Sequence, residues 1–548
     1  MERRELISSN SIREFFNEIF IDHKNVEFTS SLSPKSGTLD RRNALHLLRR
    51  ISFQPTIKEL EYFDGMEITE AVNLLLGDGN DDLPENASRL PNPDDYSETK
   101  SWYQNAIQSP SSAGALELKF ELEGILKSRF RKTQDWIIRL AKEEDLTENP
   151  AREKLTYFLN SIWNIEFTYD TRSFNPPNLL LKNNNTLRKL RLGSYKDIAK
   201  EMTLDGAFLL YQSLQLSNKE APNENFAREL LELFTMGIGN YTEGNIKEAS
   251  RILTGWRTAP FFNSKKPNGE FSTWFDPGAH DKTSKQFMGS IFSGINESEN
   301  NEFKVRDNEV YKLIDVIFDV GRDAIAKFIA TKIVKFFVYA NEKDIDSNLV
   351  NSTSQSLIDN DFNLRSVYFE LFTSEEFFDS KYYGVQYKSP FELIVGTSRS
   401  FDLSLETTEE RNTMYNMEQV LYDPPDVSGW EQYRTWISTT TYPYRNSYLW
   451  GLVNKFDNQS IQQFIKDVPQ WENPDLFFRY LFDYLTPINF IDERETYVVD
   501  GIVFNNTSNS NMTKANWQNL VDSSDPEILD RVKSAISVII VSPDFQLT

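Results

Sequence analysis

Apolar residues recur at intervals of three and four along much of the chain, which is the spacing of one face of an α-helix. The stretch from Ile325 to Ala340 shows it, because its isoleucines and phenylalanines share one face while three lysines point away. The segment from Leu155 to Ile162 repeats the pattern. Alternation typical of strands is rare. We therefore expect a mainly α, multi-helical globular protein with one or two small β-hairpins.

Two places favour strands. Around Asp500-Gly501, two triplets of β-prone residues flank the pair between Tyr497 and Phe504. Asp-Gly between such residues is a strong hairpin signal, so the sequence predicts a β-hairpin near residues 495–505. A second, weaker ribbon is expected from Phe271 to Phe275, returning near Phe287.

One stretch interrupts the helical pattern. Residues 77–96 read GDGNDDLPENASRLPNPDDY and are rich in Pro, Asn and Asp, a composition typical of a long loop or linker. We therefore expect an N-terminal helical segment at 1–76, an acidic loop or linker at 77–100 and a main helical domain at 101–548.

Composition narrows the function classes. The 59 Lys and Arg against 82 Asp and Glu give a net charge of −23, which argues against nucleic acid or an anionic membrane surface as partner. Cysteine is absent and there are only three histidines, so thiolate chemistry and cysteine-based zinc sites are excluded. We expect no metal and no other cofactor. Neither a signal peptide nor a membrane-spanning segment is visible in this sequence, so we also expect no membrane insertion.

The stretch from Pro222 to Trp256 predicts a helical hairpin, and its first helix, NENFARELLELF, carries a row of charges. Arg228 lies four residues from both Glu224 and Glu232, so it can pair with each of them. One interpretation is a pocket wall, in which Glu229 or Glu232 acts as acid or base and Arg228 holds an anion. The other is a structural row of ion pairs. We expect the row to be buried, with Trp256 among the residues that shield it.

The loop FDPGAHDKTSK carries a second set of candidates. His280 and Asp281 are candidate catalytic residues, since histidine titrates near neutral pH, and Lys285 is a candidate cation for binding. A turn whose histidine bonds to the backbone is the structural alternative. We expect His280 or Lys285 to approach the glutamates of the Arg228 helix across a cleft.

Two further motifs carry binding candidates. In the helix HLLRRISF, Arg49 and Arg50 are suited to a phosphate or an acidic partner. His46 is a further binding candidate, although a lone histidine on an apolar helix is more often a hydrogen-bonded core residue. In the turn PPDVSGW, Asp426 and Trp430 are candidates because an exposed indole stacks on sugar rings or peptides. A buried Trp430 would only fill a joint between helices.

Taken together, these segments resemble an uncharacterised bacterial family known as domain of unknown function 1800. The matching stretches follow one another in the family's order over about residues 41–548. They are HLLRRISFQPT, NENFARELLELFTMGIGNYTEGNIKEASRILTGW, FDPGAHDKTSKQFMG, AKFIATKIVKFFV, YKSPFELIVG, PPDVSGW and SPDFQL.

The resemblance implies a largely helical, often exported protein, with no agreed activity. The chain departs from the pattern at Phe234, where many relatives carry histidine, so any role of that histidine is lost here. By resemblance, the recurring polar positions are His46, Arg49, Asn223, Glu224, Asn225, Arg228, Glu229, Glu232, Thr254, Trp256, His280, Asp281, Lys285, Asp426 and Trp430.

The first functional hypothesis is a helical binding or scaffold protein of the bacterial envelope or exterior, acting with a protein or glycan partner. The alternative is a hydrolase or lyase whose pocket is formed by the Arg228 hairpin and the His280 loop. Export is expected from the resemblance alone, and a cytoplasmic location stays open because this sequence shows no signal peptide.

Overall fold

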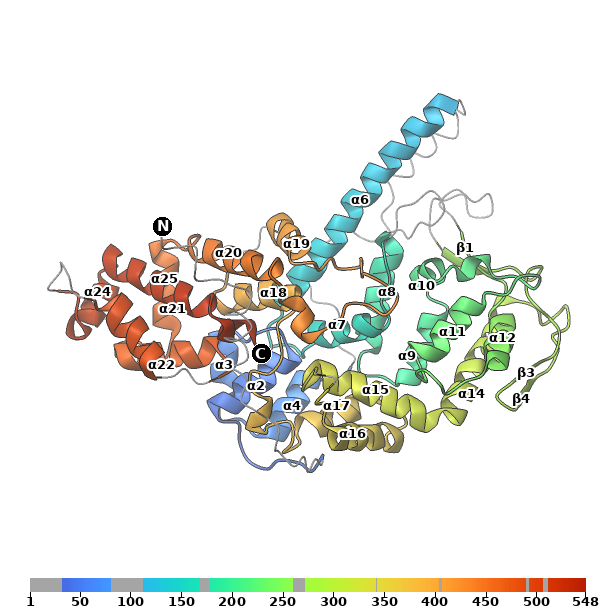
Figure 1. Cartoon of the computed structure of the whole chain (residues 1–548), viewed down its shortest axis with the longest axis horizontal. Coiled ribbons are helices and arrows are strands. Elements are labelled where there is room, and N and C mark those ends of the chain that lie inside the picture. Colours follow the sequence, from blue (N-terminus) through green and yellow to red (C-terminus); the bar gives the residue numbers. More distant parts are fainter. Residues whose placement is uncertain are drawn as a thin grey trace.

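The computed structural model describes residues 32–79, 112–167, 177–259, 272–341, 343–403, 407–488, 492–505 and 511–548. The expected mainly α class is confirmed, with helices throughout and small antiparallel strand pairs (Figure 1). Of the predicted loop at 77–100, residues 80–100 lie outside the described part of the chain.

The first helices occupy the middle of the molecule rather than one end (Figure 1). Local sequence sets where they begin: Asp40 accepts the backbone N–H of Asn43, and Thr56 and Glu59 form a capping box. These helices are α2 (Arg41–Ile51), α3 (Ile57–Phe63) and α4 (Ile68–Leu76).

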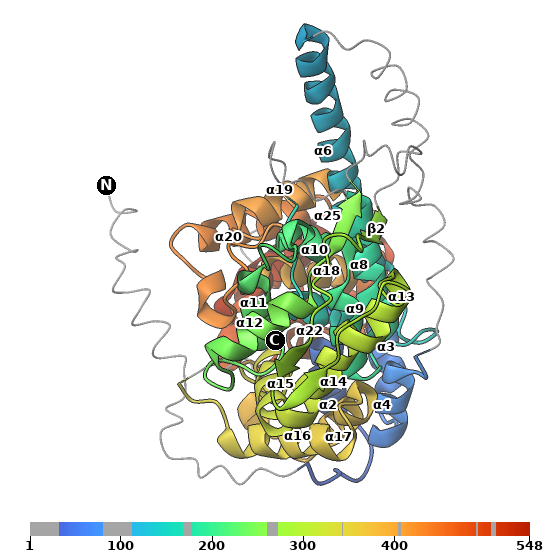
Figure 2. The same ribbon diagram turned by 90° about the vertical axis from the view of Figure 1, so that its right-hand side faces the viewer.

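A long helix follows and projects from the body of the molecule in both views (Figures 1 and 2). This helix is α6 (Ser112–Glu143), and its C-terminal part packs against α18 (Pro390–Ser400) and α8 (Pro177–Leu190). The helices after it are α7 (Glu153–Ile162), α8 (Pro177–Leu190), α9 (Tyr195–Thr203), α10 (Gly206–Tyr211) and the 3-10 turn η2 (Leu214–Leu216).

The predicted helical hairpin is present as α11 (Glu224–Glu232) and α12 (Glu243–Ile252). The prediction of a second, weaker ribbon was correct for one strand and wrong for its pairing. A strand is found at β2 (Ser272–Phe275), but it pairs with β1 (Trp256–Ala259) and not with the region of Phe287. Phe287 ends β3 (Lys285–Phe287), which turns at Met288 and Gly289, both with positive φ, into β4 (Ser290–Phe292). A two-residue turn of this kind joins neighbouring strands directly.

The next part of the chain, residues 302–416, is mainly helical. The expected helix within 325–340 is confirmed as part of α15. In chain order the elements are α13 (Glu302–Val305), the π-helical η3 (Arg306–Tyr311), α14 (Lys312–Val320), α15 (Arg322–Phe337), α16 (Ser347–Asp359), α17 (Leu364–Phe372), η4 (Ser380–Tyr382), α18 (Pro390–Ser400) and α19 (Thr407–Asn416).

The C-terminal elements lie mostly at the left end of the molecule in Figure 1, and the C-terminus itself lies near the middle. They are η5 (Tyr433–Trp436), α20 (Thr441–Val453), α21 (Asn458–Asp467), α22 (Pro474–Leu485), α23 (Asp492–Thr496), the π-helical η6 (Tyr497–Val503), η7 (Lys514–Asn516), α24 (Trp517–Asp522), α25 (Pro526–Ile540) and η8 (Pro543–Gln546).

The prediction of a β-hairpin near 495–505 was wrong, because α23 continues there into the π-helical η6. A tight Asp-Gly turn needs positive φ, and neither Asp500 nor Gly501 has it. Packing decided the conformation. Val498, Val499 and Val503 are buried, η6 packs on α25, and Arg531 of α25 donates to the Val503 carbonyl at 3.0 Å.

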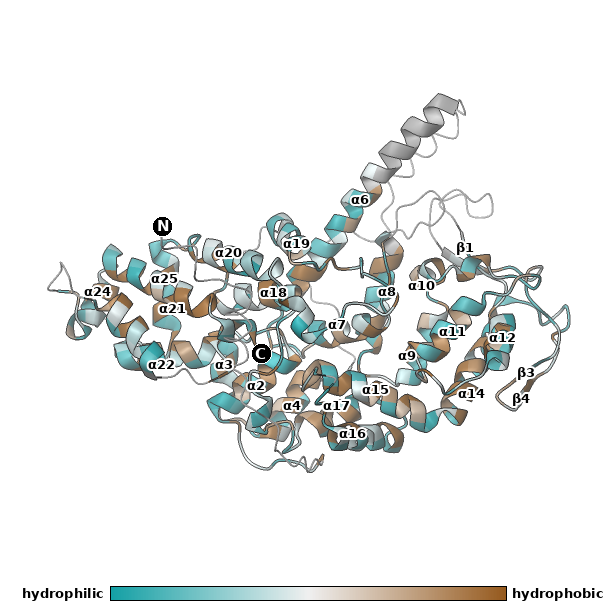
Figure 3. Ribbon diagram, in the orientation of Figure 1, coloured by the Kyte–Doolittle hydropathy of each residue, from teal (hydrophilic) through white to brown (hydrophobic). Residues whose placement is uncertain are grey.

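The apolar residues of all these regions join one continuous core. Figure 3 shows the hydrophobic faces of the helices turned toward one another and the hydrophilic faces outward. Among the described helices, none combines the length and the apolar character that a membrane span requires.

Candidate functional site

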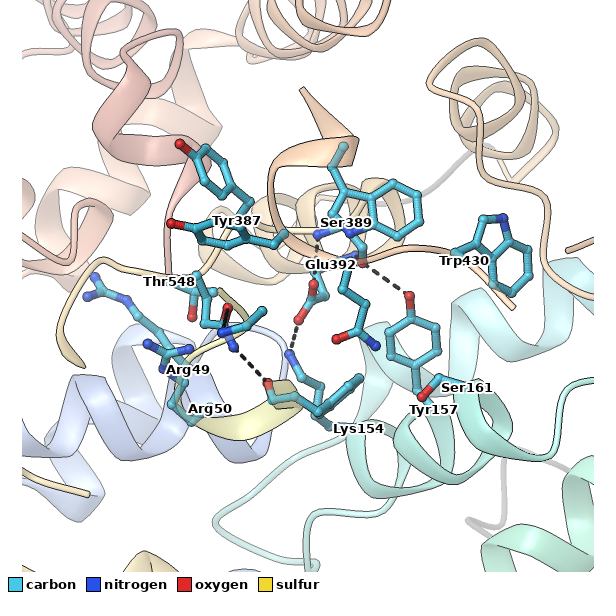
Figure 4. Close-up of a pocket in the computed structure, with 16 residues that line it drawn as sticks. Arg49, Arg50, Lys154, Tyr157, Ser161, Tyr387, Ser389, Glu392, Trp430 and Thr548 are labelled. Carbon is cyan, nitrogen blue, oxygen red and sulfur yellow. Dashed lines mark hydrogen bonds and ion pairs between the residues drawn. The ribbon is translucent and has the colours of Figure 1, made fainter. Parts of the chain in front are cut away.

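A cavity lies where α2, α7, α15 and α18 meet the segment from Trp430 to Trp436 (Figure 4). The centres of water molecules can occupy about 40 Å³ inside it. The whole empty space, which includes open solvent at its edge, is about 560 Å³. One water needs roughly 10–15 Å³ on the first measure. That space therefore accommodates a group the size of a carboxylate or phosphate.

Arg49 enters this cavity from the last turn of α2 and is anchored there by the backbone. Its Nη2 donates to the carbonyl oxygens of Tyr484 at 2.7 Å, Asp483 at 3.1 Å and Thr486 at 3.3 Å. These carbonyls lie at the C-terminal end of α22, where unpaired acceptors carry partial negative charge. Burial lowers the pKa of Arg49 to about 10. Arg49 thus ties α2 to α22.

Arg50 is less well satisfied. Its side chain is 2% exposed, and Nη2 donates to the Tyr382 carbonyl at 2.7 Å. Within the described part of the chain, its Nε and Nη1 are buried without a hydrogen-bond partner. Burial is the main cause that lowers the pKa of Arg50 to about 9, although Glu392 opposes it. Such unpaired buried donors are costly. Arg50 thus lines the cavity with part of its hydrogen-bonding capacity unused among the described residues.

Lys154 and Glu392 form a buried ion pair between Arg50 and Trp430 in the view of Figure 4. Glu392 also accepts the backbone N–H of Ser389 at 2.7 Å, in a capping box that starts α18. Burial raises the pKa of Glu392, but Lys154 and Ser389 outweigh it, so the net pKa is lowered. Among the described side chains that line the cavity, Arg49, Arg50 and Lys154 face this single carboxylate.

Aromatic side chains also line the cavity. They include Trp430, Tyr433 and Tyr387, and the rings of the two tyrosines lie 5.2 Å apart at 75°. The turn that carries Trp430 is pressed against α7, since a Cβ on Gly429 would meet Asn164 Nδ2 at 3.1 Å. Gly429 has φ of +90°, so only glycine fits there easily. The close approach fixes Trp430 at the cavity.

A second cavity adjoins the first, because Arg49 and Thr548 line both. It offers about 340 Å³ for the centres of water molecules. His46 lies in its wall, where the ring stacks on Tyr383 at 4.1 Å and donates from Nε2 to the Phe377 carbonyl at 3.0 Å. Burial, and then Arg50, lower the pKa of His46 well below its usual value. His46 is therefore a neutral, bonded residue.

The His280 loop forms a different arrangement. Lys285 donates to both carboxylate oxygens of Glu309 at 2.7 Å, and His280 Nε2 lies 3.1 Å from the same carboxylate. All three side chains are at most 2% exposed. His280 Nδ1 donates to the Thr254 carbonyl at 2.8 Å. Burial lowers the pKa of Lys285, and Glu309 opposes it. This cluster is held together by its own contacts.

The Arg228 row differs from the expectation in both partner and burial. Arg228 forms a two-pronged pair with Glu243 of α12, at 2.9 and 2.7 Å, rather than with Glu224 or Glu232. Its side chain is 38% exposed. The expected approach of His280 or Lys285 to this row was also wrong, because both contact Glu309. Neither cavity around Arg49 is lined by α11, α12 or residues 276–285.

A model of the family described as "Protein of unknown function (DUF1800)" matches residues 46–547. The chain belongs to this family. The resemblance noted from its motifs is thereby confirmed. No curated protein and no solved structure matches the chain.

The structure separates the residues suggested by the DUF1800 motifs into groups. Arg49 and Trp430 line one cavity, and His46 lines the next. Glu229 and Asp426 lie near Tyr211: burial first, and then nearby acidic charges that include these two, raise the pKa of that phenol.

The remaining candidates are engaged elsewhere in this DUF1800 chain. Asp281 accepts from Arg251 Nε at 2.8 Å, and Glu232 accepts from the Tyr241 hydroxyl. Trp256 is buried against Phe275, with ring centroids 5.2 Å apart. Within the described residues, no group of three His, Asp or Glu side chains is arranged to hold a metal ion.

Sequence reasoning missed Lys154, Glu392 and Tyr433 at the cavity and Glu309 beside His280. One signal was readable. Ser389-Pro390-Phe391-Glu392 is a capping-box sequence that places Glu392 in the first turn of a helix. Lys154 and Tyr433 carry no local signal of that kind.

Proposed function

We propose that this protein is a binding protein whose cavity at Arg49 and Arg50 takes an anionic group of a glycan or protein partner. The observation that carries the proposal is Arg50 itself: its side chain lines a cavity whose described lining side chains include three cations and one carboxylate, and its Nε and Nη1 have no hydrogen-bond partner among the described residues. A carboxylate or phosphate oxygen is the natural acceptor for a guanidinium.

Binding is favoured over hydrolysis or elimination at this cavity. Glu392 is bonded to Ser389 and Lys154, and its pKa is lowered, so at neutral pH it has no proton to donate. Tyr157 has a pKa raised by burial and then by Glu392, which disfavours a base role for the phenol. The groups present are suited to holding a charge.

Location at the bacterial envelope or exterior stays part of the proposal and rests on the family resemblance. Fractionation of cells that express the protein from its native locus, followed by immunoblotting, tests it. Recovery in the cytoplasm alone would contradict this part while leaving the binding proposal intact.

Isothermal titration calorimetry with sodium phosphate, sulfate and acetate at fixed ionic strength tests the binding proposal. Arg50→Met should weaken binding by about 1.5–3 kcal/mol, the usual contribution of a hydrogen bond to a charged group. Arg228→Met removes the same charge from an exposed position and is the matched control. Equal affinities for the wild type and Arg50→Met would contradict the proposal.

A further inference from the structure

A cluster of buried cations extends from the wall of the cavity at Arg50 into the interior. Arg50 and Lys154 line the cavity, whereas Lys388 and Arg445 are buried without lining it. At most 3% of each of these four residues is exposed. Burial lowers the pKa of Lys388 well below its usual value, and the positive charges of Arg445 and Lys154 are among those that lower it further. The four groups are therefore close enough to act on one another.

Three of these cations are hydrogen-bonded to neutral oxygens. Arg50 donates to one backbone carbonyl at 2.7 Å, and Lys388 donates to a second at 2.8 Å. Arg445 donates to a third carbonyl at 2.8 Å and to an amide oxygen at 3.1 Å. Among the described residues, Lys154 alone of the four has a carboxylate as its ion-pair partner, which is Glu392. The bonds orient the other three cations but leave their charges unbalanced.

Buried guanidinium groups elsewhere in the fold have carboxylates of their own. Arg399 donates to both oxygens of Glu59 at 2.7 Å, and Arg188 donates to both oxygens of Glu153 at 2.7 Å. Such pairing offsets the cost of removing a charge from water. The cations at the cavity depart from this arrangement, so their charge is a feature of the site rather than of the fold in general.

Glu392 is the shared counter-ion of the cluster. Burial lowers the pKa of each of the four cations, and Glu392 is the carboxylate that opposes this for Arg50, Lys154, Lys388 and Arg445. If Lys388 is left out of the count because its lowered pKa favours the neutral amine, three cations remain against one carboxylate. The cluster then has two positive charges in excess.

Arg49 does not enter this count. Burial lowers its pKa, and the negative charge of Asp483 is among those that oppose the change. Asp483 lines the second cavity and not the first. Its carboxylate also lies near Arg41 and Arg42, whose charges lower its pKa against the effect of burial. The carboxylate near Arg49 is therefore already shared among other arginines and does not balance the cluster around Glu392.

We infer that the anionic group of the ligand carries two negative charges, as a phosphate monoester does near neutral pH. A carboxylate or a sulfate ester carries one charge and would leave half of the excess unmet. The three free oxygens of a phosphate ester accept hydrogen bonds from guanidinium and ammonium groups. This inference rests on the proposed function, since it identifies the anion that the same cavity takes.

Calorimetry on the full chain with methyl phosphate and methyl sulfate at fixed ionic strength tests the inference. The two esters have the same shape, but at pH 7 only the phosphate carries a second charge, since its second pKa is about 6. We expect methyl phosphate to bind about tenfold more tightly at pH 7. At pH 5 only about a tenth of it is doubly charged, so the two affinities should be nearly equal. Taking the ratio at each pH cancels the titration of the protein's own groups.

Variants of Arg445 test whether the charge of the cluster causes the preference. Arg445→Met removes a charge without removing a residue from the cavity wall, so the preference at pH 7 should fall by about threefold. Arg445→Lys keeps the charge and should keep the preference. Arg228→Met, at an exposed position, is the control. An unchanged preference in a folded Arg445→Met protein would contradict the role of the cluster. If that variant does not fold, the wild-type ratios at pH 7 and pH 5 decide alone.

Equal affinities for the two esters at pH 7 overturn the inference and leave the anion site standing. That result would mean that charges within the fold, such as a carboxyl group at Thr548 in the cavity wall, already balance the cluster. If neither ester nor any other anion binds, the proposed function itself fails. Since a phosphate ester can belong to a sugar or to a phosphorylated side chain, D-glucose 6-phosphate and N-acetyl-O-phosphoserine amide are compared as well, and the tighter of the two identifies the source.

Discussion

Arg50 and Lys285 are both buried cations, yet their surroundings differ in a way that separates the proposed binding site from a structural cluster. Lys285 meets the two oxygens of Glu309 at 2.7 Å, with His280 on the same carboxylate. Arg50 borders a cavity and has two buried donors with no partner among the described residues. A charge matched inside the fold stabilises the fold, whereas an unmatched one at a cavity is suited to a ligand.

The largest expected effect tests the structural half of this comparison. Glu309→Gln removes the shared carboxylate and leaves Lys285 uncompensated, so the free energy of unfolding should fall by about 3–5 kcal/mol. Urea denaturation followed by circular dichroism measures it. The matched control is Glu297→Gln. Glu297 pairs with Lys282, and its side chain is 83% exposed, so the free energy of unfolding should change little. A loss below about 1 kcal/mol would mean that the cluster is not structurally important.

At the proposed binding site we expect a change in the free energy of unfolding of the opposite sign. Arg50→Met replaces an incompletely paired buried cation with an apolar side chain of similar length, so without ligand the free energy of unfolding should rise by about 1 kcal/mol. The loss of the bond to the Tyr382 carbonyl limits the gain. Saturating phosphate should reverse the order of the two proteins, because only the wild type is stabilised by binding. A less stable variant in ligand-free buffer would place Arg50 with the structural ions.

The dependence of stability on acid pH tests Asp281, the charged residue next to His280. Burial raises the pKa of Asp281, but bonds from Thr283 and Arg251 outweigh it and lower the pKa to about 2. The stabilisation is therefore complete above the usual pKa of 3.8 and is lost as pH falls toward 2. Since the carboxylate is partly screened by solvent, we expect about 1 kcal/mol of it. Asp281→Asn should remove this part of the acid dependence in urea titrations, and an unchanged pH slope would contradict the assignment.

The smallest effect is expected at Arg228. Its pair with Glu243 is solvent-exposed, and exposed pairs contribute little to folding. Arg228→Ala should keep the urea midpoint within experimental error of the wild type. A large loss would return this row to the class of buried ion pairs that its sequence spacing suggested.

These cases show what could be predicted from the sequence. Helices such as α15 were predictable because one apolar face repeats over several turns. The Asp500-Gly501 hairpin was not, since burial of Val498, Val499 and Val503 against α25 overrode a local turn preference. At Arg228 the four-residue spacing identified possible partners, but it could not rank them against Glu243 on the neighbouring helix.

The candidate site could be predicted only in part. Arg49, Arg50 and Trp430 stood out as residue types suited to binding. Their convergence did not, because the cavity joins segments separated by hundreds of residues. The partners that give Arg50 its character, among them Lys154 and Glu392, depend on packing that no local pattern encodes.

The anchoring of Arg49 has a consequence for how the protein folds during synthesis. Its Nη2 bonds to carbonyls that follow it by 434, 435 and 437 residues. Contacts this distant in sequence form late, because closing a long loop costs entropy before any contact offsets it. On the ribosome, α2 emerges long before α22. Arg49 and Arg50 therefore remain an adjacent pair of positive charges in the nascent chain until α22 has been made. The cavity that we propose as an anion site is therefore complete only when nearly all of the described chain has been made.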